Sequence, residues 1–405
     1  MALTVVETFV GCGGSYLGFK KAGFDTVFVN DIWEEAVTTL KTNNNELSDE
    51  QVICTDIKML DTDVLKKQFH QLQSLDVLIG GVVCKGFSLA GVRNPCDERN
   101  YLYLEQLRLV EAFMPKLSII ENVPGMVNMK ILKQDTDKQK CETLCELYEQ
   151  LKKLKGRKIT INKTLSNNEY KDNKEKILLE NELIENEKKS KQLAEKRDSI
   201  KDELEDNMYS VVEDIEKRYE SLGYKVYKKV LCCADYGSAT SRKRLFIVAV
   251  RGDIKKEWTY PKPIYGEKGG DLPSWRTVRD AFNMIDYSVE DKDNVPMTHK
   301  SSTVDKFKKI EKVNKSGTYF SRGSSSRLVF DEVAPTLVPG HSSFQLHPVE
   351  HRSITVREGA TITGFPTDYK FFGSHSSRCV QIGNAIPVDM AYAIALQSKH
   401  FLCSI

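Results

Sequence analysis

The stretch Asp76-Val-Leu-Ile-Gly-Gly-Val-Val-Cys-Lys-Gly-Phe-Ser88 joins an apolar run to two glycines and a thiol. This pattern predicts a buried strand that ends in a loop carrying Cys84. A second apolar run, Leu117-Ser-Ile-Ile120, ends abruptly in Glu121. Because parallel strands end at the same edge of a sheet, these two strands place a nucleophile and an acid together. Such a pair suits attack on an electron-poor ring that is protonated at the same moment.

Strand and helix signals alternate on both sides of these two runs. Helical patterns separate the strands of the first 130 residues, and this alternation predicts an α/β fold built from βαβ units. Strand signals return after residue 208, and a final helix begins near Pro387. Besides the two runs quoted above, the predicted strands cover residues 3–6, 26–29, 52–55, 224–230 and 245–250.

The composition is that of a soluble globular protein. The chain has 405 residues, 40% of them hydrophobic and 29% charged, and no window approaches 18 consecutive apolar residues. We therefore expect neither a membrane span nor a secretory signal. The ten cysteines contain no recurring Cys-x-x-Cys pair, so we expect reduced thiols in a cytosol and no metal site. A net charge of +2 requires any basic surface to be local.

A glycine-rich loop follows the first predicted strand in the stretch Thr8-Phe-Val-Gly-Cys-Gly-Gly-Ser15. Glycines between a strand and a helix let a ligand touch the backbone at the helix N-terminus. The next strand ends in Asp31, placed to bind ribose hydroxyls, and a third ends near Asp56, suited to an adenine amino group. The loop lacks the Gly-Lys-Ser/Thr of a triphosphate site. The alternative interpretation is that both aspartates are helix N-caps.

These features, with further motifs in a fixed order, resemble the DNA (cytosine-5) methyltransferase family of bacterial and phage type. The resemblance covers nearly the whole chain, and six motifs in order hardly arise by chance. The matching motifs are the glycine loop, Gly80 to Ser88, Glu121-Asn122-Val123, Thr240-Ser-Arg242-Lys-Arg244, Arg327-Leu328 with Ala334-Pro335-Thr336, and Gln381-Ile-Gly-Asn384-Ala-Ile-Pro387.

The resemblance implies a reaction and a set of catalytic residues. A thiolate at Cys84 would add to carbon 6 of a flipped cytosine in duplex DNA, and Glu121 would bond to nitrogen 3. Arg244 would hold the base oxygen, and Arg242 would support the loop or a backbone phosphate. The family's motifs also assign catalytic positions to Asn122, which follows the acid, and to Ser88, which would contact a phosphate.

The resemblance also implies S-adenosylmethionine as cofactor, S-adenosylhomocysteine as product and no metal. The fold implied is a Rossmann-like sheet with a smaller target-recognition domain and a helical hairpin insertion. The positions that would contact the cofactor are Phe9, Gly11, Cys12, Gly13, Gly14, Asp31, Ile32, Asp56, Ile57, Leu102 and Asn384.

The chain departs from the family pattern at three positions near the predicted site. Val83 replaces a proline before the nucleophile, so the loop loses a fixed φ angle. Lys85 replaces a glutamine, and its ammonium would lower the thiol pKa or pair with a phosphate. Thr240 replaces a glutamine in the basic motif. None of these changes removes a reacting group.

Composition divides the chain into five segments. The predicted catalytic domain is interrupted by a lysine- and glutamate-rich insertion and by a target-recognition domain that contains Trp258 among basic and aromatic residues. The segments are 1–133 (catalytic, first part), 134–208 (insertion), 209–251 (catalytic, second part), 252–326 (target recognition) and 327–405 (catalytic, folding back beside the N-terminus).

The insertion has the pattern of an antiparallel helical hairpin. Leucines recur three and four residues apart from Leu144 to Leu154, and a second stripe runs from Leu193 through Leu204 and Met208 to Ile215. Asn167-Asn168 marks the turn. A solvated spacer, a self-association arm and a clamp on DNA are the three alternatives for its role, and its balanced charge argues against a pure phosphate clamp.

Two other functions remain as alternatives to DNA methylation. One is methylation of cytosine in tRNA, and the other is a catalytically silent DNA-binding protein, suggested by Val83 and Lys85. A dedicated segment before Arg327 favours DNA over tRNA, and retention of Cys84, Glu121 and Arg244 favours catalysis. A companion restriction endonuclease in a bacterial or phage-infected cell is the expected setting.

Overall fold

A computed structural model describes residues 2–82, 94–95, 97–133, 136–166, 168–310, 326–338 and 344–405. These residues form two compact units, which we describe separately. The first comprises the described parts of 2–82, 103–124 and 218–405, and the second those of 94–102 and 125–217.

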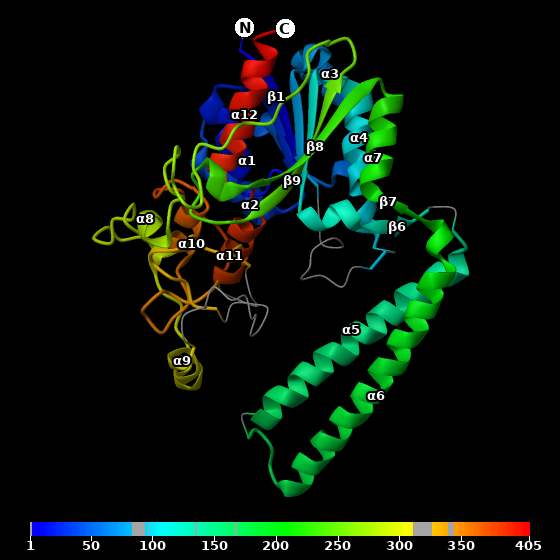
Figure 1. Ribbon diagram of the computed structural model, residues 1–405, viewed down its shortest axis with the longest axis vertical. Coiled ribbons are helices and arrows are strands. Elements are labelled where there is room, and N and C mark those ends of the chain that lie inside the picture. The colour runs from blue at the N-terminus through cyan, green and yellow to red at the C-terminus, as the bar shows by residue number, and fades with distance from the viewer. Residues whose placement is uncertain are drawn as a thin grey trace. The chain divides into compact units, whose positions relative to one another are not determined.

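The first unit is built on a seven-stranded sheet in the order β3-β2-β1-β4-β5-β9-β8 (Figure 1). The first five strands are parallel, and β9 runs antiparallel to both of its neighbours. The prediction of an α/β fold with a largely parallel sheet is confirmed. The strands are β1 (Thr4–Thr8), β2 (Asp25–Asp31), β3 (Val52–Cys54), β4 (Val77–Gly81), β5 (Leu117–Asn122), β8 (Tyr224–Cys232) and β9 (Lys243–Arg251).

Helices cover both faces of this sheet. On one face, α1 (Gly14–Ala22) and α12 (Val388–Leu402) pack together so closely that a Cβ on Gly18 would lie 2.5 Å from Cβ of Ala391. Alternate residues of the strands, such as Val77 and Ile79, join them in the core. On the other face, Phe28 of β2 contacts the ends of α3 (Thr62–Gln68) and α4 (Leu102–Phe113), and α2 is Glu34–Asn43.

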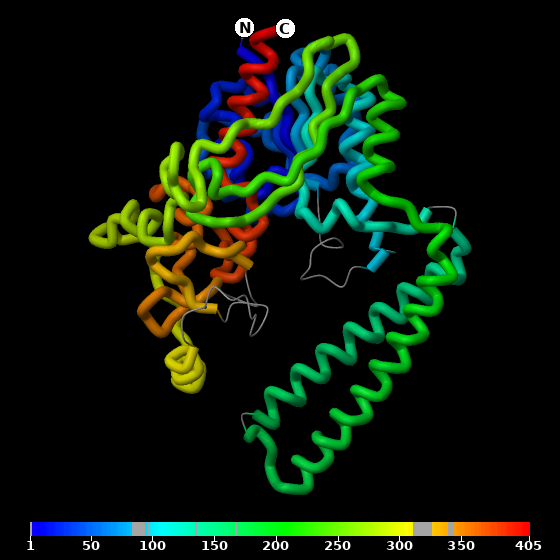
Figure 2. Tube along the Cα trace, in the orientation of Figure 1, coloured from blue at the N-terminus to red at the C-terminus, as the bar shows by residue number. Residues whose placement is uncertain are grey.

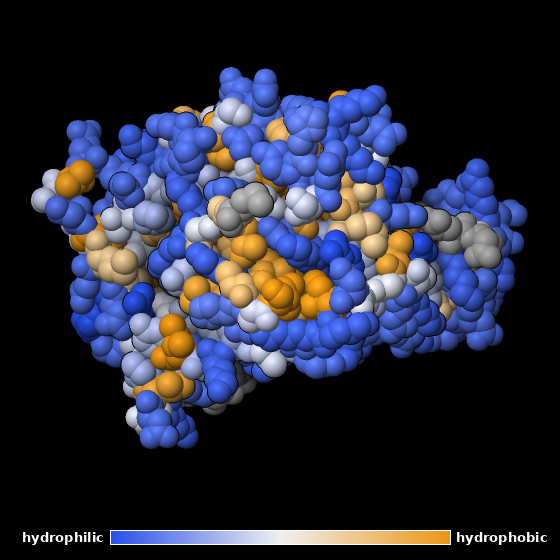
Figure 3. All heavy atoms as spheres, turned by 90° about the horizontal axis from the view of Figure 1, so that it is seen from above, coloured by the Kyte–Doolittle hydropathy of each residue, from blue (hydrophilic) through white to orange (hydrophobic). Residues whose placement is uncertain are grey.

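Among the described residues, only the stretch from His375 to Leu402 is long and apolar enough to pass a test for a membrane span. It consists of two helices, α11 (His375–Asn384) and α12, separated at Pro387. More than half of its most apolar window is buried, and α12 packs into the core of the sheet. Such burial is typical of a core helix. Hydrophilic side chains dominate the face seen in Figure 3, where hydrophobic ones gather in limited groups.

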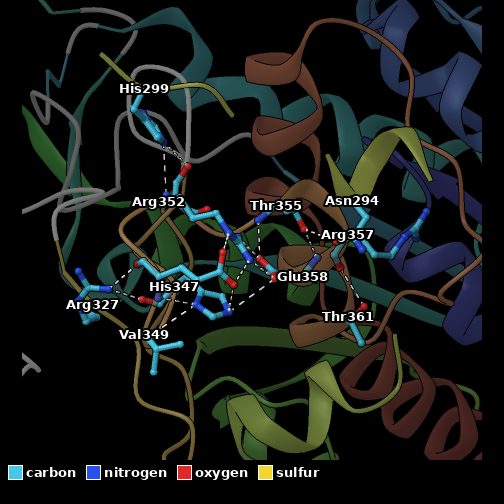
Figure 4. Close-up of polar contacts among 12 residues, drawn as sticks. Asn294, His299, Arg327, His347, Val349, Arg352, Thr355, Arg357, Glu358 and Thr361 are labelled. Carbon is cyan, nitrogen blue, oxygen red and sulfur yellow. Dashed lines mark hydrogen bonds and ion pairs between the residues drawn. The ribbon is translucent and has the colours of Figure 1, made fainter. Parts of the chain in front are cut away.

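The same unit contains a smaller cluster of α8 (Val278–Phe282), α9 (Ser301–Lys308), α10 (Val356–Ile362) and α11. Its polar centre is the buried Glu358, which pairs with both terminal nitrogens of Arg352 at 2.8 and 2.9 Å and caps α10 through Thr355 (Figure 4). Arg327 donates to the carbonyls of His347 and Phe307 and so ties α9 to this centre.

One residue of the predicted target-recognition segment has a different place. Trp258 is 3% exposed and packs edge-on against Phe401 of α12. Its prediction as a nucleic-acid contact is wrong, because the indole lies in the core of the sheet domain. The segment's lysines on α9, by contrast, lie at the surface, as Lys306 and Lys308 do.

The second unit is a long helical arm that rises from a small sheet. The arm consists of α5 (Lys138–Ser166) and α6 (Asn173–Glu203), which pack side by side (Figure 2). Its base is an antiparallel pair, β6 (Lys130–Leu132) and β7 (Met208–Ser210). The predicted helical hairpin is confirmed, with Asn168 in the left-handed region at the turn, and Asn167 lies outside the described residues.

The predicted continuous stripe from Leu204 to Ile215 is wrong. Helix α6 ends at Glu203, Met208 lies in β7, and a new helix, α7 (Val211–Ser221), begins after it. The backbone of Lys133 donates to Asn207, and that of Val211 to Met129, so this stretch is tied to residues 129–133. The spacing of apolar residues continued through the break, because a short strand and the flanking helices bury the same side chains.

Candidate active site

The predicted acid lies beside a guanidinium at the carboxyl end of β5. Nε of Arg244, from β9, is 2.7 Å from Oε1 of Glu121, and the two side chains are 10% and 9% exposed. In the β5–β9 ladder Glu121 lies opposite Phe246, two residues beyond Arg244. Residues two apart on a strand share a face, so the ladder itself brings this acid and this cation together.

Burial controls the protonation of Glu121. It raises the pKa of the carboxyl above its ordinary value, and the neighbouring Arg244 offsets only part of that rise. No N–H group is well aligned with the buried Oε1, so the pair is held by charge rather than by a directed hydrogen bond. A carboxyl with a raised pKa keeps its proton to higher pH and can donate it to a ring nitrogen.

Gly81 leaves space between this acid and the glycine loop. It lies opposite Glu121 in the β4–β5 ladder. A Cβ at Gly81 would lie 3.5 Å from Oε2 of Glu121 and 3.7 Å from the carbonyl oxygen of Phe9. The end of β4, the acid and the glycine loop therefore converge on one point at the carboxyl edge of the sheet.

Asn122 holds the end of β4 in place. Its Nδ2 donates to the carbonyl of Val82 at 3.1 Å, and its Oδ1 accepts the backbone N–H of Val123 at 2.8 Å. The side chain is 1% exposed. Asn122 therefore acts on the backbone that leads into the nucleophile motif. Cys84 and Ser88 themselves lie outside the described residues, as do Val83 and Lys85.

The glycine loop has the backbone that its sequence predicts. Phe9, Gly11 and Gly13 all have positive φ angles, and α1 begins immediately afterwards at Gly14. A Cβ on Gly14 would lie 2.2 Å from the carbonyl oxygen of Ile386, so the loop is pressed against the segment after α11. A Cβ on Gly11 would meet nothing within 4 Å, which leaves open space for a ligand. The side chain of Cys12 is buried.

Asp31 is oriented toward this loop by backbone bonds. Its Oδ2 accepts the N–H of Gly11 at 2.8 Å, and its Oδ1 accepts that of Trp33 at 2.9 Å. Burial raises the pKa of Asp31, and these bonds partly counter the rise. Next to it, Ile32 is 66% exposed, which presents an apolar surface beside the loop.

Asp56 has the simpler of its two predicted roles in this structure. Its Oδ1 caps a short 3-10 helix by accepting the N–H of Lys58 at 3.0 Å, and Ile57 is buried behind it. Arg108 of α4 donates to the carbonyls of Ile57 and Leu60, both at 2.9 Å. Sequence analysis missed Arg108, because a lone arginine on a helix carries no motif. Leu102 is the first residue of α4.

Arg242 lies deep in the fold rather than at a surface. It is 1% exposed, and its two terminal nitrogens donate to the carbonyls of Gly383 and Asn384. These carbonyls end α11, where a cation is favourable. Asn384 itself is exposed. The roles predicted for Arg242, support of the loop or of a phosphate, stay predictions, and the contact that the structure provides is with the last motif.

A buried acid that sequence analysis missed lies in β1. Glu7 is 1% exposed, and neither carboxylate oxygen accepts a well-formed hydrogen bond. Burial raises the pKa of Glu7 to about 8, with a small opposing effect from Ser15 of α1. The signal was an acidic residue inside a strand whose neighbours are apolar. Among the residues that the structure describes, no three His, Cys, Asp or Glu side chains form a metal-binding group.

A family model for C-5 cytosine-specific DNA methylases matches residues 3–147 and 203–400. The unmatched residues between them form most of the α5–α6 arm.

Two curated relatives cover nearly the whole chain. The Type II methyltransferase M.DdeI of Desulfomicrobium norvegicum is 26% identical over 97% of this chain and 88% of its own length. The Type II methyltransferase M.Sau96I of Staphylococcus aureus is 26% identical over 98% of this chain and 76% of its own length.

Two solved structures share the fold. A proposed DNA modification methyltransferase encoded within an E. coli prophage superposes with a TM-score of 0.62 at 20% identity, covering 99% of this chain and all of that one. The Entamoeba histolytica methyltransferase EhMeth gives a TM-score of 0.55 at 14% identity, covering all of this chain and 98% of that one. With the family match spanning both ends of the sheet domain, the chain belongs to the C-5 cytosine-specific DNA methylase family.

Proposed function

We propose that this protein methylates carbon 5 of a cytosine in a specific duplex DNA sequence, with S-adenosylmethionine as methyl donor and a transient bond to Cys84. The observation that carries the proposal is the buried Glu121–Arg244 pair, which adjoins Gly81 and the glycine loop. It puts a carboxyl with a raised pKa at the end of the strand next to the one that leads into the nucleophile motif.

The residues divide the reaction into balanced steps. The Cys84 thiolate bonds to carbon 6, Glu121 donates a proton or hydrogen bond to nitrogen 3, and the electron pair of the 5–6 double bond becomes available at carbon 5. Arg244 holds the base oxygen and keeps Glu121 in place. After methyl transfer, loss of the proton from carbon 5 to a base restores the double bond and expels the thiolate.

The glycine loop and its neighbours fit the proposed cofactor. When bound, S-adenosylmethionine supplies the electrophilic methyl group. Gly11 borders open space, Asp31 offers a carboxylate held by two backbone bonds, and Ile32 offers an exposed apolar face suited to an adenine ring. Arg242 fixes the carbonyls of residues 383–384 and so positions Asn384.

Cofactor binding is testable residue by residue. We expect Asp31→Ala to weaken S-adenosylmethionine binding by about 1–3 kcal/mol, the cost of losing charge-assisted hydrogen bonds. Asp56→Ala should weaken it less, because the Asp56 carboxylate already caps a helix. Isothermal calorimetry with the purified protein measures both. Unchanged affinity in Asp31→Ala would move the cofactor elsewhere.

Bisulfite sequencing of DNA from a host that expresses the protein tests the reaction and reveals the target. We expect methylated cytosine in one sequence context with the natural chain and none with Cys84→Ser, whose hydroxyl is far less nucleophilic. Duplex DNA with 5-fluorocytosine at the target should form an adduct of fixed mass with the natural chain. Methyl transfer to tRNA but not to DNA would replace this proposal with the RNA alternative.

The Type II relatives support a setting in restriction and modification. We propose that the protein acts in the cytoplasm on double-stranded DNA and protects its target from a companion endonuclease. Residues 252–326 would read the target bases. Self-association through the arm remains a prediction, and light scattering of the natural chain tests it.

A further inference from the structure

The base of the arm is bonded to the segment that follows the nucleophile motif in sequence. The hydroxyl of Tyr101 donates to the carbonyl of Leu132 in β6, at 2.6 Å. Tyr101 ends a 3-10 helix, Glu98–Tyr101, whose N-terminus is capped by Asp97. The chain that leaves the motif at Ser88 thus reaches a fixed point on the arm thirteen residues later.

The arm base is a firm support. Leu132 pairs with Met208 across the β6–β7 ladder, and both side chains are buried with Leu144, Tyr148 and Leu204. This cluster closes the two ends of the arm against each other. Outside it, ion pairs such as Lys140–Glu203 are exposed and add little. Most of the stability of the base therefore comes from apolar burial.

The segment of residues 97–101 has further ties that fix its shape. Asn100 is 1% exposed, and its Nδ2 donates to the carbonyl of Asn94 at 2.8 Å. The pKa of Asp97 is lowered mainly by the side chain of Arg99, and the charge of Lys152 on α5 contributes. A cation on the arm therefore lies close enough to act on this segment.

We infer that the base of the arm is a positioning element for the nucleophile segment, with Tyr101 as the link. The inference rests on the proposed function, because it assigns the arm base a part in presenting Cys84. It also divides the arm in two. The family match includes Leu132, Leu144, Leu204 and Met208 but omits residues 148–202, so the base and the distal part are separable.

Tyr101→Phe tests the link, because it removes one hydroxyl and keeps the ring. We expect the rate of adduct formation with 5-fluorocytosine DNA, at saturating DNA and S-adenosylmethionine, to fall about three- to tenfold, which is the effect of one lost hydrogen bond. Cofactor affinity should stay within about twofold, since α4 is held separately by Arg108. A merely structural role would lower thermal stability without changing the rate of adduct formation.

Two arm variants supply the matched controls. Replacing residues 153–190 with a four-residue turn removes the distal arm and keeps the buried cluster, so the adduct rate should match that of the natural chain. Replacing residues 134–207 with a Gly/Ser linker removes the base, and adduct formation should fall at least as far as in Tyr101→Phe while cofactor still binds.

Two results would overturn the inference while leaving the proposed function intact. One is a normal adduct rate in both Tyr101→Phe and the full arm deletion. The other is a normal rate in Tyr101→Phe with a strong loss in the shortened arm, which would place the role at the tip. If the natural chain itself forms no adduct and methylates no DNA, the proposed function fails instead.

Discussion

An arginine and a glutamate meet at nearly the same distance in two regions of this protein, yet the carboxyls behave oppositely. In the sheet domain, Nε of Arg244 lies 2.7 Å from Glu121, and in the arm, Nε of Arg157 lies 2.6 Å from Glu182. Burial raises the pKa of Glu121, whereas Arg157 lowers the pKa of the exposed Glu182.

The difference shows that the surroundings, and not the partner, set the chemistry of these acids. The side chains of the arm pair are 49% and 41% exposed, so water solvates both charges and screens their attraction. In the sheet domain the loss of water penalises the ionised carboxylate more than one arginine compensates. Only the buried pair is therefore suited to hold a proton for catalysis.

The largest expected effect separates the two glutamates by rate. Glu121→Gln removes the proton donor and should lower kcat for methyl transfer by roughly 10²–10⁴-fold, the usual contribution of a positioned general acid. Glu182→Gln should leave kcat unchanged. Transfer of radiolabelled methyl groups to duplex DNA measures both. A Glu121→Gln enzyme with normal turnover would show that nitrogen 3 needs no acid.

The pH dependence should also separate them. Because the pKa of Glu121 is raised, its protonated form persists above the ordinary value of 4.5 and is lost as pH rises through the raised pKa. We expect kcat to fall along that limb, about tenfold per pH unit if the acid form is required. Folding stability should decline over the same rise, because the folded state holds the extra proton.

The opposite sign applies to the arm. The lowered pKa of Glu182 means that its contribution to stability is present above its ordinary pKa and is lost as pH falls through the lowered value. A pH–rate profile of Glu182→Gln that differed from that of the natural chain would contradict the contrast between the two regions.

A third prediction extends the contrast to arginines. Arg242→Lys should weaken S-adenosylmethionine binding about three- to tenfold, because a lysine cannot bond to the carbonyls of Gly383 and Asn384 with the same fork. Arg157→Lys, at the exposed pair, should leave cofactor affinity unchanged. Calorimetry on both variants measures the difference, and equal affinities would remove Arg242 from the cofactor site.

The smallest expected effect is on the arm itself. Glu182→Gln should change the free energy of unfolding by less than about 1 kcal/mol, and added salt should reduce the change further. Urea denaturation at low and high ionic strength measures it. A loss above about 2 kcal/mol would show that the exposed pair acts within a larger network.

Patterns of apolar residues predicted most of the sheet domain. The runs that end in Gly80–Gly81 and in Glu121 became β4 and β5, and the basic motif became the start of β9. Each of these elements is specified locally, by an apolar run with a clear end. The helical arm was predicted for the same reason, because its leucines repeat within one helix.

Contacts between distant segments were beyond the reach of the sequence. Arg242 bonds to carbonyls about 140 residues away, and Arg108 to carbonyls about 50 residues away. Backbone carbonyls have no sequence signature, so nothing marks them as partners. The three-residue strand β7 was also missed, because so short a strand is defined by its pairing with β6 and not by its own composition.

The pairing of Leu132 with Met208 has a consequence for how the gene tolerates change. Paired residues of antiparallel strands lie roughly 5 Å apart, so the arm leaves and re-enters the fold through a narrow neck. A neck of that kind accepts inserts of any length whose own ends lie close together. A ligand-binding domain spliced in beyond Leu144 and before Leu204 would turn this insertion point into a socket for a drug-controlled enzyme.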